Sequence, residues 1–206
     1  MAPILTDVTV PSWASHVEDK QAPMPLLLVQ AFVDTQDRDL GTDILAHRDE
    51  ARAWLAGAGL RAPDPDRPDA GFADDLLLAR DARDSIRALI GRNTGDEPLA
   101  PGDLAPLEQV LREARPRLEI GADGQARLGP VPPAHTLADG LLALLIIIRD
   151  AQADGSWDRL KLCGNPDCRW AFYDRSHSRR GAWCDMASCG NRLKNRSLRA
   201  RRAQVS

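Results

Sequence analysis

Residues 163–189 read CGNPDCRWAFYDRSHSRRGAWCDMASC, and this stretch holds every cysteine of the 206-residue chain. The cysteines form two pairs of equal spacing, Cys163 with Cys168 and Cys184 with Cys189. Two short pairs that a hairpin brings together can supply four sulfurs to one tetrahedral ion, so the spacing predicts one structural Zn²⁺ per chain. Because sulfur would fill all four coordination positions, no position is left for a catalytic water.

Two disulfides are the alternative use of four cysteines, and they require an oxidising compartment. Residues 1–17 have neither the basic region nor the continuous apolar region of a signal peptide. The longest apolar run, residues 141–148, is far too short to span a membrane. We therefore predict a cytoplasmic protein with reduced thiols and no membrane partner, which favours the metal site.

The residues between and after the cysteines predict a small treble-clef-like zinc finger. Residues 164–166 are Gly, Asn and Pro, which allow a tight turn that points two sulfurs at one centre. Residues 169–173 alternate as a strand does, and residues 182–183 can return as its hairpin partner. Asp185 is a suitable N-cap for a helix that begins at Met186 and carries the last cysteine.

Upstream of the finger, hydrophobic periodicity predicts a mainly helical domain. The run at 141–148 indicates a helix that is apolar on every side and therefore central. Alternating residues on both sides of Asp123-Gly124 predict a β-hairpin. The expected helices span residues 26–33 (with a strand as the alternative), 47–58, 74–90 with Gly91 as its end, 103–114, and a stretch capped by Thr136; the expected strands span 117–120 and 125–128.

The fold class that these elements predict is α+β. Residues 1–25 form a loose lead-in, and residues 26–153 form the mainly helical domain with its hairpin. Residues 157–206 form the finger, which ends in a basic helix. Because residues 151–156 are small and polar, they mark the expected domain boundary, and we expect a chain that ends near Ala153 to fold alone.

Charge is distributed unevenly along the chain. From residue 157 onward there are twelve Lys and Arg against four Asp and Glu, whereas residues 1–156 hold fifteen against twenty-six. A basic end on an acidic body is expected when only that end meets a polyanion. The predicted nucleic-acid contacts are Arg175, Arg179, Arg180, Arg192, Lys194, Arg196 and Arg199. The alternative is that these cations neutralise the metal-thiolate site and pack against the acidic body.

The tetrad Cys189-Gly190-Asn191-Arg192 is the one that names the CGNR zinc-finger family, and residues 160–202 resemble that family. Residues 26–60 resemble the opening of an ABATE domain, through the segments 32–35 and 53–56. Where that family usually has asparagine before a threonine, this chain has Asp34. The resemblance implies a stress-induced transcription regulator that binds DNA.

The leading functional hypothesis is a DNA-binding transcription regulator whose N-terminal domain senses a small-molecule ligand or forms a homodimer. One alternative is a protein-interaction module in which the zinc finger is purely structural. The other is an enzyme with a pocket in residues 26–150. No nucleophile–base pair can be assigned around the isolated histidines, so we predict no enzyme and no catalytic residues. The acidic residues Asp34, Asp37 and Asp39 are interpreted as a solvated helix end, with cation binding as the alternative.

Overall fold

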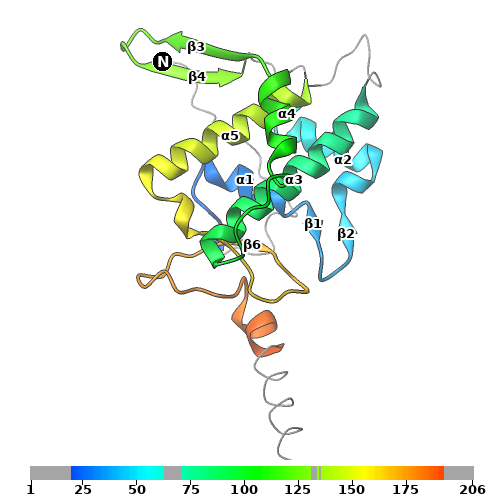
Figure 1. Cartoon of the computed structure of the whole chain (residues 1–206), viewed down its shortest axis with the longest axis vertical. Helices are drawn as coiled ribbons and strands as arrows, with labels where there is room; N and C mark the ends of the chain where they lie inside the picture. Colours follow the sequence, from blue (N-terminus) through cyan, green and yellow to red (C-terminus); the bar gives the residue numbers. More distant parts are fainter. Residues whose placement is uncertain (1–19, 63–70, 131–133, 135, 193–206) are drawn as a thin grey trace, which may run out of the picture.

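The computed structural model describes residues 20–62, 71–130, 134 and 136–192. It confirms the α+β class: helices form the body, and the described strands pair in three two-stranded antiparallel sheets (Figure 1). The helices are α1 (Leu26–Val33), α2 (Arg48–Gly57), α3 (Phe72–Thr94), α4 (Ala105–Glu113) and α5 (Leu137–Asp154). The sheets pair β1 (Gln36–Asp37) with β2 (Thr42–Asp43), β3 (Pro116–Ile120) with β4 (Ala126–Pro130), and β5 (Leu160–Leu162) with β6 (Ala171–Tyr173).

Helix α3 is longer than its periodicity predicted, and Gly91 is not its end. The helix runs through Gly91 to Thr94 and stops at Gly95, whose φ of 90° is the left-handed conformation that ends many helices. Gly91 is instead buried inside the helix. A glycine does end the helix, as predicted, but that glycine is Gly95 and not Gly91.

Helix α5 begins as the capping pattern predicted. The Thr136 hydroxyl donates to the Asp139 carboxylate at 2.8 Å and accepts from the Asp139 amide at 3.2 Å. Leu141, Leu144 and Ile148 are buried in the core. The helix is central, as predicted, since Ile147 packs against the main core and Ile146 against a smaller cluster, although both side chains are only half-buried. The helix thus has one face in the core and another at its margin.

The β3–β4 hairpin confirms the Asp123-Gly124 prediction, and it projects from the end of the molecule opposite the finger (Figure 1). The hairpin expected inside the finger is not formed. The partner of β6 is β5, which precedes the first cysteine, and Ala182 is tied to Gly164 by a backbone hydrogen bond of 2.8 Å instead. A five-residue apolar pattern cannot specify its partner strand, because alternation gives the face of a strand and not its neighbour.

Residues on the finger side of the expected boundary belong to the main hydrophobic core. Trp157, Leu160, Leu162, Ala171 and Tyr173 are buried together with α1, α3 and α5 residues in a single cluster. Two other small clusters accompany this core, one around the cysteines and Phe172 and one around Ala114, Ala138 and Leu142. The polar residues 151–156 therefore mark the end of a helix rather than a break in packing.

Candidate metal centre

The four cysteines converge at the finger end of the molecule. All four are buried, none forms a disulfide, and their sulfurs lie within 4.8 Å of one another. The Sγ atoms of Cys168 and Cys184 are 3.7 Å apart, and those of Cys184 and Cys189 are 3.8 Å apart. Four sulfurs at zinc-thiolate bond length from one ion lie about 3.8 Å apart in a regular tetrahedron. The sulfurs are therefore spaced as one metal site requires.

The knuckle around the first pair is built by Asn165. Its carbonyl accepts from the amides of Cys168 and Arg169, both at 3.0 Å, which closes the turn. Its side-chain amide donates to the Cys189 sulfur at 3.7 Å, and the residue is buried. Asn165 thereby joins the first cysteine pair to the second. The Asn-Pro signal at 165–166 was interpreted only as a turn, and the contact with Cys189 could not be anticipated from it.

The second pair is positioned by a short π-helical turn, η4 (Met186–Gly190). The Asp185 carboxylate caps it, accepting from the Ala187 amide at 3.1 Å and from the Ser188 amide at 2.7 Å. This confirms the predicted N-cap. Cys189 lies within η4 and Cys184 directly before its cap, so one local structure fixes both sulfurs.

The thiols influence one another strongly. Hydrogen bonds with Cys168 and then Cys184 lower the pKa of the Cys163 thiol to about 2, while hydrogen bonds with Cys163 and then Cys168 raise the pKa of the Cys184 thiol far above its usual range. A bound divalent cation would stabilise the deprotonated form of all four.

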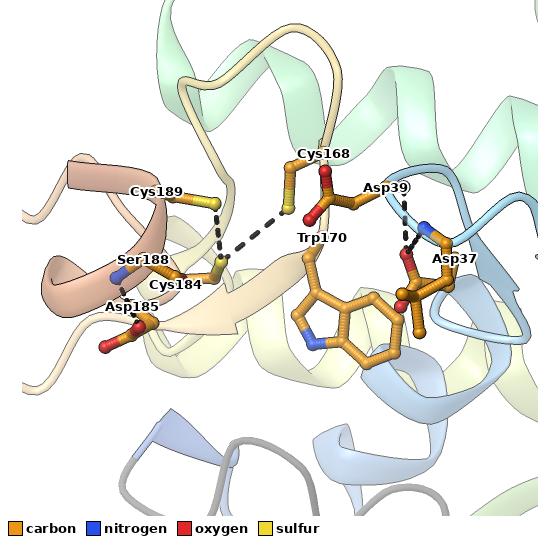
Figure 2. Close-up of a pocket in the computed structure, with 9 residues that line it drawn as sticks. Asp37, Asp39, Cys168, Trp170, Cys184, Asp185, Ser188 and Cys189 are labelled. Atoms are coloured by element: carbon orange, nitrogen blue, oxygen red, sulfur yellow. Dashed lines mark hydrogen bonds between the residues drawn. The ribbon is translucent and has the colours of Figure 1, made fainter. Parts of the chain in front are cut away.

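A pocket of about 340 Å³ opens beside the cysteines. Figure 2 shows the sulfurs of Cys168, Cys184 and Cys189 on one side and Asp37 and Asp39 on the other. The Asp37 carboxylate accepts hydrogen bonds from the backbone amides of Asp39 and Leu40, each at 2.9 Å. The complete lining is Asp37, Asp39, Leu40, Cys168, Trp170, Cys184, Asp185, Ser188 and Cys189.

Arg192, a predicted nucleic-acid contact, lies against the acidic loop. One of its terminal nitrogens is 2.7 Å from each Asp39 oxygen, and both side chains are partly exposed. This contact corresponds to the alternative in which basic residues pack against the acidic body. An exposed pair of this kind contributes little to stability, so Asp39 can be exchanged for another anion.

Three other predicted contacts, Arg175, Arg179 and Arg180, share one exposed turn of the finger. The turn is organised by Asp174, whose carboxylate accepts from the Gly181 amide at 2.7 Å and from the Ser176 hydroxyl at 2.6 Å. Buried Lys161 lies 3.1 Å from the same carboxylate. The remaining predicted contacts, Lys194, Arg196 and Arg199, lie outside the described residues.

Asp174 remains ionised over a wide pH range. Burial raises the pKa of this carboxyl, but the hydrogen bonds from Ser176 and Gly181 and the ammonium of Lys161 outweigh burial and lower the pKa to about 2. The basic turn is therefore held in a fixed shape at neutral pH. Sequence reasoning missed Asp174, although an aspartate followed by a Ser/Gly-rich turn is a recognisable turn-forming signal.

Two buried side chains of α1 and its C-terminal end hold strand β6 of the finger. Gln30 donates from its amide to the Ala171 carbonyl at 3.1 Å, and the Asp34 carboxylate accepts from the Ala171 amide at 2.8 Å. Lys20 adds a bond of 2.5 Å to the Trp183 carbonyl. The interpretation of Asp34 as part of a solvated cluster is wrong, because its side chain is buried against β6.

We expect Asp34→Asn to stabilise the protein at neutral pH, because burial raises the pKa of the Asp34 carboxyl well above its usual range, despite the opposing effects of the Ala171 amide and Arg87. The folded chain binds a proton that the unfolded chain releases above a pH of about 4, so this group's contribution to stability falls as pH rises. Asparagine keeps the oxygen acceptor without the charge. Urea unfolding between pH 4 and 8 should show a widening advantage, reaching on the order of 1 kcal/mol.

Asp34→Ala is the matched control, because it removes the acceptor and leaves the buried Ala171 amide without its bond. That variant should lose about 1–3 kcal/mol. Equal stability of the two variants would show that the Asp34–Ala171 bond does not matter for folding.

Among the described residues of the N-terminal segment, a cavity bears on the ligand and enzyme hypotheses. It measures about 250 Å³ and is lined by Asp81, Asp84, Ser85, Ala88, Asp103 and Pro106. The Ser85 hydroxyl donates to the Asp81 carbonyl at 3.0 Å, as a helical serine often does. Among the lining residues there is no histidine, lysine or cysteine, so the cavity offers carboxylates but no nucleophile–base pair.

Comparison with protein families finds two matches. The ABATE model, described as "Putative stress-induced transcription regulator", matches residues 27–153, and the CGNR zinc-finger model matches residues 159–202. Among curated proteins, none matches this chain. Within the described residues, no helix has the length and apolar character needed to cross a membrane. The two matched segments follow one another in the order that the sequence motifs indicated.

Proposed function

Since this chain belongs to the ABATE family of regulators and carries a CGNR zinc finger, we propose that it binds DNA and regulates transcription in the cytoplasm. We further propose that the metal is Zn²⁺, one per chain, and that Cys163, Cys168, Cys184 and Cys189 are its ligands. The sulfur spacing and the all-thiolate donor set support this identity, because four thiolates in a tetrahedron suit zinc. With four protein ligands the ion would be structural.

The observation that carries the DNA-binding proposal is the exposed basic turn at residues 175–180. It presents three arginines on a backbone that Asp174 and Lys161 hold in place. A backbone held in place limits the backbone entropy lost when the turn meets phosphates, and guanidinium groups match phosphate oxygens in geometry. The turn lies next to the metal site in the sequence, so zinc would order the surface that contacts DNA.

The test is a titration of duplex DNA at several salt concentrations with the zinc-loaded full chain. Each phosphate contact contributes about 0.9 to the slope of log affinity against log salt, so Arg179→Ala/Arg180→Ala should lower the slope by up to about 1.8. Arg196→Ala/Arg199→Ala tests the basic C-terminal residues in the same way. Zinc content, measured in parallel, should stay at one per chain.

The control is Arg112→Ala/Arg149→Ala, which removes two exposed arginines of the N-terminal segment. It changes the net charge by the same amount and should leave the slope unchanged. An unchanged slope in both finger variants, or no wild-type binding at low salt, would refute DNA contact by these residues.

A protein-interaction module is the second candidate, and the Arg192–Asp39 pair favours it. In that case the finger is a structural element that docks onto acidic protein surfaces, beginning with its own acidic loop. The ligand-sensing hypothesis would use the acidic cavity at Asp81, Asp84 and Asp103, whose carboxylates would select a cationic ligand. DNA retardation separates the first candidate from the second.

A further inference from the structure

The β3–β4 hairpin carries an unusual concentration of exposed apolar side chains. Leu118 and Ile120 of β3 are 66% and 68% exposed, and every residue of β3 is exposed. Leu128 lies opposite Leu118 on β4, so the three share one face of the ribbon. The hairpin packs against α5 mainly through β4, and β3 is the outer strand (Figure 1).

Within the described residues β3 pairs with β4 alone, and its other edge presents backbone groups as well as side chains. The Gly121 amide donates to the Gln125 carbonyl at 2.9 Å, which sets the alternation of the ladder. In an antiparallel pair, hydrogen-bonded and non-hydrogen-bonded positions alternate. Glu119 therefore turns its backbone groups toward Arg127, whereas Leu118 and Ile120 turn theirs toward the free edge. Such an edge is a template for another strand.

The sequence of β3 is complementary to itself. In an antiparallel pairing of two copies around Leu118, Arg117 lies opposite Glu119 of the partner subunit, and Glu119 opposite Arg117 of the partner subunit. Pro116 lies opposite Ile120 of the partner subunit, where its carbonyl can accept from the isoleucine amide, although proline has no N–H to donate to the isoleucine carbonyl. The two Leu118 side chains meet at the axis. A two-fold axis therefore gives matched charges and apolar contacts in one register.

We propose that this chain forms a symmetric homodimer by pairing the β3 edges of two copies into a continuous four-stranded antiparallel sheet. This inference is independent of DNA binding, because it concerns the opposite end of the molecule. Since the hairpin and the finger lie at opposite ends (Figure 1), the two fingers face outward at the far ends of the dimer. Such a dimer presents its fingers to two separated sites rather than to one.

The pairing of two five-residue strands buries little surface compared with standard interfaces of about 1,600 Å². The dimer is therefore reversible and depends on protein concentration. At low salt, where the opposed charges attract each other most strongly, we expect monomer and dimer to be in equilibrium at roughly micromolar to tens of micromolar protein.

The test is sedimentation equilibrium of the zinc-loaded full chain, without DNA, at several concentrations and low salt. The wild type should approach twice its mass of 22.5 kDa as concentration rises. Arg117→Glu and Glu119→Arg each place like charges across the axis and should weaken dimerisation at least tenfold. The double variant Arg117→Glu/Glu119→Arg restores opposite charges and should recover the dimer.

Arg112→Glu, on the exposed face of α4, is the control with the same change of charge and should dimerise as the wild type does. Circular dichroism shows whether each variant is folded. Leu118→Lys places two like charges at the two-fold axis and should also weaken dimerisation. A wild type that is monomeric throughout, or single variants that dimerise as strongly as the wild type, would overturn the proposal. Because no DNA is present, the result stands apart from the outcome of the DNA titration.

Discussion

Removal of the metal is expected to unfold the finger and to destabilise the rest of the protein with it. Structural zinc sites bind with roughly 10–16 kcal/mol, which is as large as the total stability of a typical domain. The knuckle and η4 meet through the cysteine sulfurs, and Phe172 packs in the same small cluster. Without the ion, the cysteines lose the bonds that hold the knuckle and η4 together, so the cluster is not expected to persist.

The destabilisation should reach the N-terminal segment because β5 and β6 are part of the main core. With free Zn²⁺ at a thousand times its dissociation constant, bound metal adds about 4 kcal/mol of stability. Chelation should therefore lower the melting midpoint by roughly 10 °C or more. Elemental analysis before chelation should give one zinc per chain, and near-ultraviolet circular dichroism should report the loss of tryptophan packing.

Cys184→Ser should reproduce the effect of chelation, because it removes a sulfur that contacts two others. His177→Ala is the control, since His177 is exposed and lies outside the four-cysteine cluster. Retention of a full equivalent of zinc by Cys184→Ser, or a folded wild type with four freely reactive thiols and no metal, would contradict the assignment.

Features set by residues close in sequence could be predicted. The cysteine spacing indicated the cluster, and the caps at Thr136 and Asp185 and the Asp123-Gly124 turn are all found where local chemistry places them. Each of these depends on hydrogen bonds or geometry spanning a few residues, which the sequence displays directly.

Features set by tertiary contacts could not be predicted. Gln30 donates to the Ala171 carbonyl and Asp34 accepts from the Ala171 amide across 141 and 137 residues of sequence. Strand β6 pairs with β5, which precedes it, rather than with the residues that follow it. In the sequence, buried polar side chains such as Gln30 and Asp34 cannot be distinguished from solvated ones, because only the folded structure shows which are buried. The same limit applies to Arg192 and Asp39, since a basic residue on a helix face gives no sign of which anion it meets.

A chain that ends at Ala153 is expected to lose its cooperative fold, contrary to what the polar residues 151–156 suggest. Truncation removes Trp157, Leu160, Leu162, Ala171 and Tyr173 from the main core. Each large apolar side chain contributes about 1.5–3 kcal/mol through burial, so their combined loss is comparable with the whole stability of a domain. The truncation also removes β6, the partner of the buried Gln30 and Asp34 side chains.

Thermal unfolding is monitored by circular dichroism and by calorimetry, which gives the heat capacity change. Binding of a dye that detects exposed apolar surface is measured on the same samples. The shortened chain should melt over a broad range or aggregate, whereas a chain that ends at Arg192 should keep the full zinc site and melt as the intact protein does. In the intact chain, Trp157→Ala should cost about 3–5 kcal/mol, since it leaves a cavity at the junction. A sharp, reversible transition for the chain ending at Ala153, close to that of the intact protein, would show instead that the two segments fold independently and that the shared core adds little to stability.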